Sequence, residues 1–139
     1  MKKTFLSDQA KEFRQKYGLK SSADRSSRAV QHKLIVEEFK EFLEAASLLY
    51  RDNPTVTAEG QLFMHGRNHQ EHALKELADL VYVCYQYAEN MGWFLDEALH
   101  RVHESNMSKL DEDGKPIYRE DGKVLKGPNY KPPDLSKLV

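Results

Sequence analysis

Two pairs of acidic residues have the spacing of a metal site. Glu38 and Glu41 lie three residues apart, and so do Glu76 and Asp79. Three residues turn a helix by about 300°, so the members of each pair share one face, one turn apart. Two such helices packed side by side would direct four carboxylates to one place, where they repel one another unless a cation lies between them. Hard divalent cations such as Mg²⁺ prefer oxygen ligands of this kind.

The residues around Asp79 favour a metal site over a solvated acidic surface. Segment 74–88 is apolar on nearly every side, which is typical of a buried helix. An ionised carboxylate is costly there unless it is paired or coordinated. Lys75, one turn before Asp79, is an alternative partner, but an ion pair alone does not explain why Glu76 shares the face of Asp79. The acids of the first helix, taken alone, favour a solvated face, since Glu is a good helix former.

Hydrophobic spacing predicts the helices that carry these acids. Apolar residues recur at helical intervals in four segments, and Asp96 could cap the last of them. We therefore predict helices at about 5–17, 28–50, 71–90 and 96–109. The segment 51–70 has weak periodicity and contains Pro54 and two glycines, which predicts a long loop with a short helix at about 59–64.

The composition changes after Leu110. The run Glu120-Asp121-Gly122 lies between two short segments that carry apolar residues, a pattern typical of a hairpin, and residues 128–133 form an extended tail. The sequence therefore predicts one all-α domain over 1–139. It would have a metal-binding helical core at 28–109 and a C-terminal β-hairpin arm with a tail at 110–139.

Composition and charge argue against several kinds of partner. The 139 residues carry a formal net charge of −1, which gives no strong field towards nucleic acid or an anionic membrane. No apolar run approaches the roughly 18 residues of a membrane span, and residues 1–5 lack the apolar stretch of a signal peptide. The single cysteine, Cys84, lies in an apolar run, which is typical of a buried thiol. We therefore expect a cytoplasmic protein that binds neither membranes nor nucleic acid directly.

The acidic motif resembles that of a known family. Glu37-Glu38-x-x-Glu41 followed by Glu76-x-x-Asp79 is similar to the signature of the MazG-like all-α nucleoside triphosphate pyrophosphohydrolases, to which phosphoribosyl-ATP pyrophosphohydrolase and the dimeric dUTPases are related. Segment 102–109, the Asp-Gly-Lys hairpin and the run 127–130 resemble the small phage and bacterial branch. The resemblance spans about 34–135 and departs from the family in the long segment between Glu41 and Glu76, which the insertion at 51–70 explains.

The resemblance implies a four-helix core and hydrolysis of a nucleoside triphosphate to the monophosphate and pyrophosphate. It also implies a Mg²⁺ ion, for which Mn²⁺ could substitute, bound by Glu38, Glu41, Glu76 and Asp79. Glu37 lies about 40° around the helix from Glu41, so it could orient or deprotonate the attacking water. Pairing of Glu37 with a neighbouring lysine, Lys33 or Lys40, is the alternative.

Five further residues are predicted nucleotide contacts: Asn106, Lys109, Lys126, Tyr130 and Tyr82. The first two follow from the resemblance, although Lys109 would also suit the carboxyl end of a helix. Lys126 and Tyr130 follow the hairpin and could close over the phosphates, or Lys126 could simply be solvated. Tyr82, one turn beyond Asp79, could stack on the base or sugar or belong to the core.

Three functions follow from these residues. The first is an enzyme of nucleotide-pool control, with a purine deoxynucleotide such as dGTP as a possible substrate by kinship with the MazZ enzymes. As a homodimer or homotetramer, it could complete each pocket with residues of a neighbouring subunit. The second is a non-catalytic helical module that binds a nucleotide or a partner helix. The third is a di-metal carboxylate oxidase, for which Glu97-x-x-His100 supplies one of the two Glu-x-x-His pairs required.

Overall fold

The protein is described by a computed structural model over residues 5–19, 25–51, 55–56, 62–63 and 66–139. It confirms the predicted all-α class. Four helices follow one another as α1 (Leu6–Lys16), α2 (Arg25–Arg51), α3 (Gly66–Met91) and α4 (Leu95–Met107). Two short antiparallel strands, β1 (Thr55–Val56) and β2 (Leu62–Phe63), lie between α2 and α3. None of the described helices is both long and apolar enough to span a membrane.

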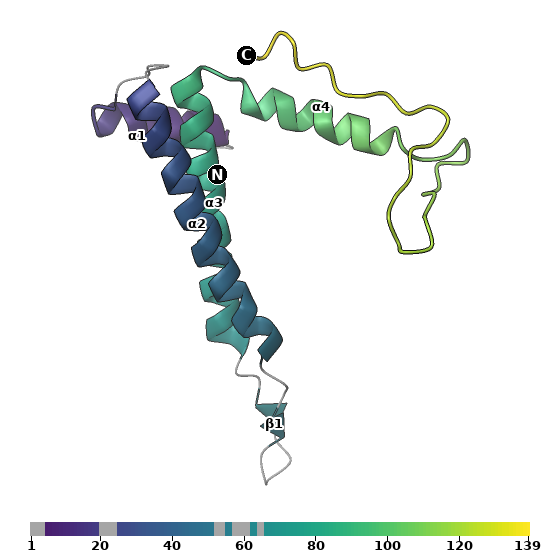
Figure 1. Ribbon diagram of the computed structural model, residues 1–139, viewed down its shortest axis with the longest axis horizontal. Helices are drawn as coiled ribbons and strands as arrows, with labels where there is room; N and C mark the ends of the chain where they lie inside the picture. Colours follow the sequence, from purple (N-terminus) through teal and green to yellow (C-terminus); the bar gives the residue numbers. More distant parts are fainter. Residues whose placement is uncertain (1–4, 20–24, 52–54, 57–61, 64–65) are drawn as a thin grey trace.

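The longest helices, α2 and α3, form an antiparallel hairpin that carries the site (Figure 1). Because the two helices are antiparallel, residues of increasing number on α2 lie opposite residues of decreasing number on α3. Contacting pairs therefore define the register. Near one end, Ser27 Oγ donates to Asn90 Oδ1 at 3.4 Å. Farther along, Ala45 and Ala73 are both buried, and small side chains of this kind allow two helices to approach closely. The same register places Glu38 opposite the segment that contains Glu76 and Asp79.

Helix α1 crosses the hairpin near the carboxyl end of α3 (Figure 1). The ring of Phe13 packs on edge against Tyr82, with centroids 5.6 Å apart. Arg14 Nη2 donates to Asn90 Oδ1 at 3.1 Å, and Gln86 Nε2 donates to the Ala10 carbonyl at 3.5 Å. These contacts fix α1 against α3 on the side of Tyr82.

Helix α4 leaves the hairpin and is followed by a C-terminal segment that runs back along it (Figure 1). We call α4 together with residues 108–139 the arm. The Phe94 N–H donates to the Leu138 carbonyl at 3.0 Å, and the Lys131 N–H donates to Ser108 Oγ at 2.9 Å. Four helices therefore form as predicted, but within one chain α4 packs on its own tail rather than along α2 and α3.

The arm does not contain the predicted β-hairpin. Tyr118 and Val124 form a single antiparallel bridge around a turn in which the Gly122 N–H donates to the Arg119 carbonyl at 2.8 Å, and no strand is assigned in residues 110–139. The apolar runs are too short to extend the ladder. Beyond them, the Gly127 N–H donates to the Lys109 carbonyl at 2.8 Å, which holds the tail at the end of α4 instead.

Several helices begin at residues other than those predicted. Helix α2 begins three residues earlier than predicted, at Arg25, and α3 begins at Gly66 rather than Glu71. Residues 62–63, predicted to belong to a short helix, form strand β2, while residues 59–61 and 64 of that helix lie outside the described residues.

Asp96 does not cap α4 as predicted. The N-cap is Phe94, and the Asp96 carboxylate accepts hydrogen bonds from Tyr85 Oη at 2.9 Å and from Ser7 Oγ. It therefore joins α4 to α1 and α3. Cys84 is free and half-buried, and burial raises the pKa of its thiol.

Candidate metal centre

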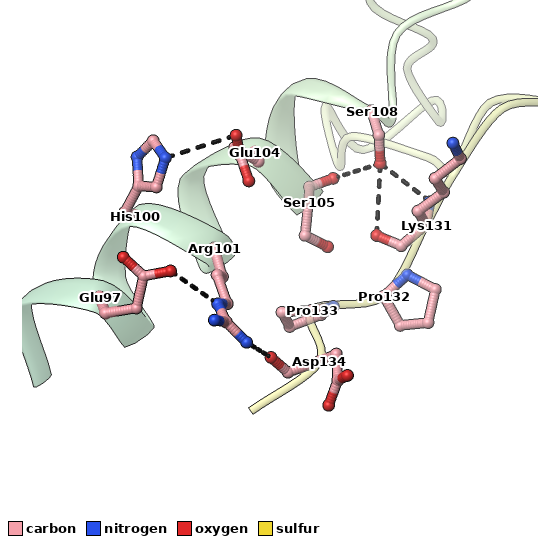
Figure 2. A pocket seen from close by; sticks show the side chains of 10 residues that line it. All are labelled: Glu97, His100, Arg101, Glu104, Ser105, Ser108, Lys131, Pro132, Pro133 and Asp134. Carbon is pink, nitrogen blue, oxygen red and sulfur yellow. Dashed lines mark hydrogen bonds and ion pairs between the residues drawn. The ribbon is translucent and has the colours of Figure 1, made fainter. Parts of the chain in front are cut away.

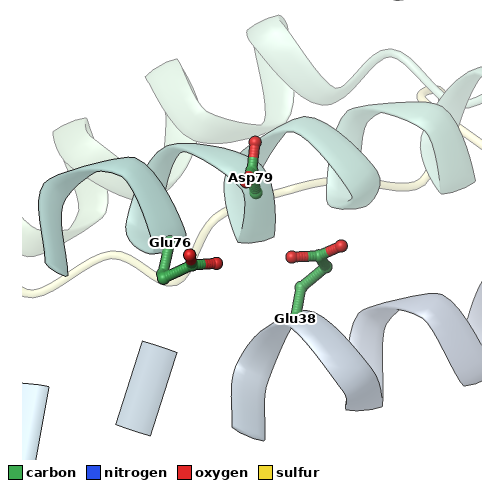
Figure 3. A group of neighbouring side chains, drawn as sticks. All are labelled: Glu38, Glu76 and Asp79. Carbon is green, nitrogen blue, oxygen red and sulfur yellow. The ribbon is translucent and has the colours of Figure 1, made fainter. Parts of the chain in front are cut away.

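Three of the four predicted metal ligands meet between α2 and α3. Glu38 comes from α2 and Glu76 and Asp79 from α3, and one oxygen of each lies within 4.8 Å of the others. Figure 3 shows the Glu38 and Glu76 carboxylates facing each other across the seam between the two helices, with Asp79 farther along the helix that carries Glu76. The antiparallel register explains the convergence, because it sets one turn of α2 against one turn of α3.

The acids of this carboxylate cluster are partly buried, and in the part of the chain that the structure describes they lack enough neighbouring partners to balance their charge. Glu76 is only 3% exposed, and Glu38 is half-buried. Glu38 Oε2 and Glu76 Oε2 are buried and have no hydrogen-bond partner among the described residues. Burial, together with the charges of Glu41, Asp79 and Glu76, raises the pKa of the Glu38 carboxyl. A buried acid is normally paired or bound to a metal, so this donor set fits a hard divalent cation.

Lys75 supplies part of the compensating charge. Its Nζ lies 2.8 Å from Asp79 Oδ2 and 3.1 Å from Glu76 Oε1, and these contacts raise the pKa of Lys75 well above its ordinary value. The predicted alternative partner of Asp79 is therefore present. Its side chain is 62% exposed, so it approaches from solvent, and the Oε2 atoms of Glu38 and Glu76 still have no partner among the described residues.

Glu41 and Glu37 lie beside the cluster rather than in it. Both are exposed. Glu41 is not one of the three converging acids, although its charge contributes to the raised pKa of Glu38. Glu37 Oε1 lies 3.8 Å from Lys33 Nζ, the lysine contact considered as its alternative role. The structure thus places a three-acid cluster where the sequence predicted four ligands.

The predicted nucleotide contacts fall into two groups. Tyr82 stays near the cluster, one turn beyond Asp79, and is partly exposed, with its ring nearly perpendicular to that of Phe13. The other four belong to the arm, which stands apart from the hairpin in a single chain (Figure 1). There, Lys109 Nζ donates to Asn106 Oδ1 at 2.8 Å, and Lys126 Nζ lies 4.5 Å from the centre of the Tyr130 ring.

The arm contains a polar cavity of about 360 Å³ between α4 and the tail, shown in Figure 2. Several of its charged groups are held by neighbouring residues of the arm. Arg101 Nε contacts Glu97 Oε1 at 2.8 Å, Arg101 Nη1 donates to the Asp134 carbonyl at 2.7 Å, and His100 Nε2 lies 3.4 Å from Glu104 Oε1. The contacts of these lining residues hold α4 against the tail. Among the described residues, the cavity has no acid cluster comparable with that of the hairpin.

Sequence reasoning missed a pair of buried amides on the hairpin. Gln31 lies seven residues before Glu38 and Gln86 seven residues after Asp79, and both are buried. The signal was available, because residues seven apart on a helix lie on nearly the same face. Polar residues at that spacing from predicted ligands could have been read as an extension of the site.

Comparison with known proteins identifies the family. Residues 2–106 match the phosphoribosyl-ATP pyrophosphohydrolase family, and this match includes all three acids of the cluster. No curated protein matches the chain significantly. The family comprises nucleotide pyrophosphohydrolases that are typically metal-dependent, which agrees with the acid cluster and the all-helical fold. The chain therefore belongs to the phosphoribosyl-ATP pyrophosphohydrolase family of MazG-like enzymes.

Proposed function

We propose that the protein hydrolyses a (deoxy)nucleoside triphosphate to the monophosphate and pyrophosphate in a Mg²⁺-dependent reaction. The carboxylate cluster carries this proposal. Acids from two helices meet in a partly buried place, and two of their oxygens have no protein partner among the described residues. In a family of nucleotide pyrophosphohydrolases, a cation that also contacts the phosphates accounts for this arrangement better than an ion pair with Lys75 alone.

Each acid has a role in this proposal. Glu38, Glu76 and Asp79 would bind the ion, with Glu41 at its exposed edge. Mg²⁺ bound there, or Mn²⁺ in its place, would supply neutralising charge for the triphosphate and Lewis acidity at the phosphorus. Glu37 would accept a proton from the attacking water. Its contact with Lys33 joins two exposed groups, and such contacts contribute little stability, so it can be given up at low cost.

A second copy of the chain would bring the arm into the site. Leu99 and Val102 on α4 are 50% and 37% exposed, and their spacing places them on the same face as Asn106. The hairpin also exposes apolar side chains, including Phe39, Leu74 and Leu77. We propose a homodimer or homotetramer in which these faces cover one another. Asn106 and Lys109 of one subunit would then contact a nucleotide bound to its neighbour.

The remaining predicted contacts fit around the same substrate. Lys126 and Tyr130 would close over the phosphates, and Tyr82 would face the base or sugar. Kinship with the MazZ enzymes favours a purine deoxynucleotide such as dGTP, and a role in control of the cytoplasmic nucleotide pool.

The proposal is tested by assaying the purified protein with all eight common nucleoside triphosphates. Pyrophosphate is detected as phosphate by malachite green after addition of pyrophosphatase. We expect release that requires Mg²⁺ and that falls at least about a hundredfold in Asp79→Asn, because that change removes a charged ligand. Asp113→Asn, which alters an exposed carboxylate of the arm, serves as the matched control and should keep full activity. Tight nucleotide binding without pyrophosphate release would instead indicate a binding module.

A further inference from the structure

Two glutamine amides extend the seam that holds the acid cluster. Gln31 on α2 is 9% exposed and Gln86 on α3 is 5% exposed. Each lies seven residues from an acid of the cluster, in the direction of α1, so the register that sets Glu38 against Asp79 also sets Gln31 against Gln86. Two helical turns separate amides and acids, a distance of about 10 Å. This is comparable with the reach of a nucleoside from its phosphate.

Both amides have an unused acceptor. Oε1 of Gln31 and Oε1 of Gln86 are buried and find no hydrogen-bond partner among the described residues. The Nε2 of Gln86 donates to the Ala10 carbonyl, which leaves Oε1 as the remaining acceptor of that amide. Leaving a buried acceptor unpaired costs stability. Two unpaired acceptors, placed opposite each other on α2 and α3, therefore point to a ligand that has two hydrogen-bond donors.

The residues between acids and amides suit a nucleotide. Tyr82 lies on α3 between Asp79 and Gln86, is 37% exposed, and presents an aromatic surface next to Phe13. Beyond the amides, the bond between Arg14 and Asn90 fixes α1 to α3. A nucleotide whose phosphates lie at the acid cluster would therefore direct its base along Tyr82 towards the two amides.

We propose that Gln31 and Gln86 bind the nucleobase of the triphosphate and select guanine. This inference rests on the proposed function. Guanine carries two adjacent groups of donors on its Watson–Crick edge, the N1–H and the 2-amino group, which match two neighbouring acceptors. Adenine and cytosine offer one amino group on that edge, and thymine and uracil offer one ring N–H. None of these four can pair with both oxygens in the same way.

The first test uses the unaltered protein with substrates that lack one donor. Replacing dGTP with dITP removes the 2-amino group, and 1-methyl-dGTP removes the N1–H. Each change should lower kcat/KM about tenfold or more, because a buried acceptor loses its partner. Equal kcat/KM for dGTP and dITP would overturn the proposal. Absence of hydrolysis with every triphosphate would instead refute the proposed function, so the two failures are distinguishable.

The second test assigns the contact to a residue. Gln31→Met keeps the length of the side chain and removes one acceptor, so it should bring kcat/KM to near equality between dGTP and one of the two analogues, dITP or 1-methyl-dGTP, namely the one that lacks the donor bound by Gln31. Gln15→Met, at an exposed position of α1, is the matched control and should leave the preference unchanged. Gln86→Met provides an independent variant if Gln31→Met does not fold, as judged by its thermal unfolding. A folded variant that retains the full preference for dGTP over both dITP and 1-methyl-dGTP would contradict the assignment.

Discussion

The α2–α3 hairpin and the arm use polar side chains in opposite ways. In the arm, Arg101 binds both Glu97 and the Asp134 carbonyl, and Arg119 pairs with Asp121. In the hairpin, Glu38 and Glu76 each keep a buried oxygen without a partner among the described residues. Polar groups that satisfy one another stabilise a local structure, whereas unpaired buried groups reduce stability unless a ligand binds them.

This difference indicates which region is incomplete by itself. In the hairpin, three acids meet and two of their buried oxygens have no partner among the described residues, so under the proposed function an ion and a substrate would satisfy them. In the arm, Arg101 and Ser108 bind the tail, whereas Leu99 and Val102 of α4 are exposed. Under the proposed assembly, each region supplies what the other lacks, with the arm of one copy next to the hairpin of another.

The largest expected effect comes from breaking that proposed contact. Leu99→Glu would place a charge in the apolar face of α4. If each copy buries one such leucine, a symmetric dimer loses about 3 kcal/mol or more, which is roughly a hundredfold in its dissociation constant. We expect monomers by sedimentation velocity and at least about a tenfold fall in turnover, because Asn106 and Lys109 no longer reach a neighbouring site.

The control for this variant is Val139→Glu, which adds the same charge at a terminal residue that is 80% exposed. It should change neither assembly nor turnover. Full activity in monomeric Leu99→Glu would show that the arm of one copy plays no part in the site of another. The polar contacts of the arm would then serve only to stabilise the arm itself.

The sequence allowed the acids of the hairpin to be predicted because their positions depend on local geometry. Glu76 and Asp79 share a face through helical spacing alone, and a hairpin register then brings Glu38 to them. Glu41 was predicted with the same logic but lies at the exposed edge, because a ligand set depends on how far each helix is rotated about its axis. Spacing within one helix does not determine that rotation.

The arm was harder to predict because its contacts are made between distant segments. The amphipathic spacing of α4 predicts a helix, but it does not specify whether hairpin or tail covers a given face. Its contacts with the tail, such as Ser108 with Lys131, join residues with no shared sequence pattern. The short runs around Tyr118 and Val124 have the turn of a hairpin, but they form only one bridge before Gly127 binds at the end of α4.

A smaller effect would separate the two explanations of the acid cluster. Lys75→Met removes the cation that contacts Asp79 and Glu76. If the cluster is a metal site, Lys75 repels the incoming ion, so its removal should tighten Mg²⁺ binding on the order of fivefold. Isothermal titration calorimetry with MgCl₂ measures this change. Lys33→Met, which removes an exposed lysine paired with Glu37, is the control and should alter the affinity much less.

The opposite outcome has a clear meaning. If Lys75→Met destabilises the protein and no Mg²⁺ binding is detected in either form, the lysine itself is the intended partner of the acids. The hairpin would then resemble the arm, with polar groups that satisfy one another.

The smallest effect concerns pH, for which the two regions should respond with opposite signs. Burial and neighbouring acids raise the pKa of Glu38 above the ordinary value of 4.5, so the folded protein binds this proton more tightly than the unfolded chain. Its contribution to stability is therefore lost as pH rises from about 4.5 through the folded pKa. In the arm, the Arg119 guanidinium lowers the pKa of Asp121 below 3.8, so its contribution is present above pH 3.8 and lost as pH falls.

Thermal unfolding in EDTA between pH 3 and pH 8 measures both signs. Glu38→Gln should match the unaltered protein near pH 4.5 and exceed its Tm by a few degrees at pH 8, because the glutamine carries no charge to bury. Asp121→Asn should lower the Tm slightly above pH 3.8, and this difference should shrink as pH falls below 3.8. Saturating Mg²⁺ should reverse the order of the first pair, since only the unaltered cluster retains its full charge for the ion. If Glu38→Gln has the lower Tm at pH 8 in EDTA, the cluster is already satisfied without a metal. The polar groups of the hairpin would then satisfy one another, as those of the arm do.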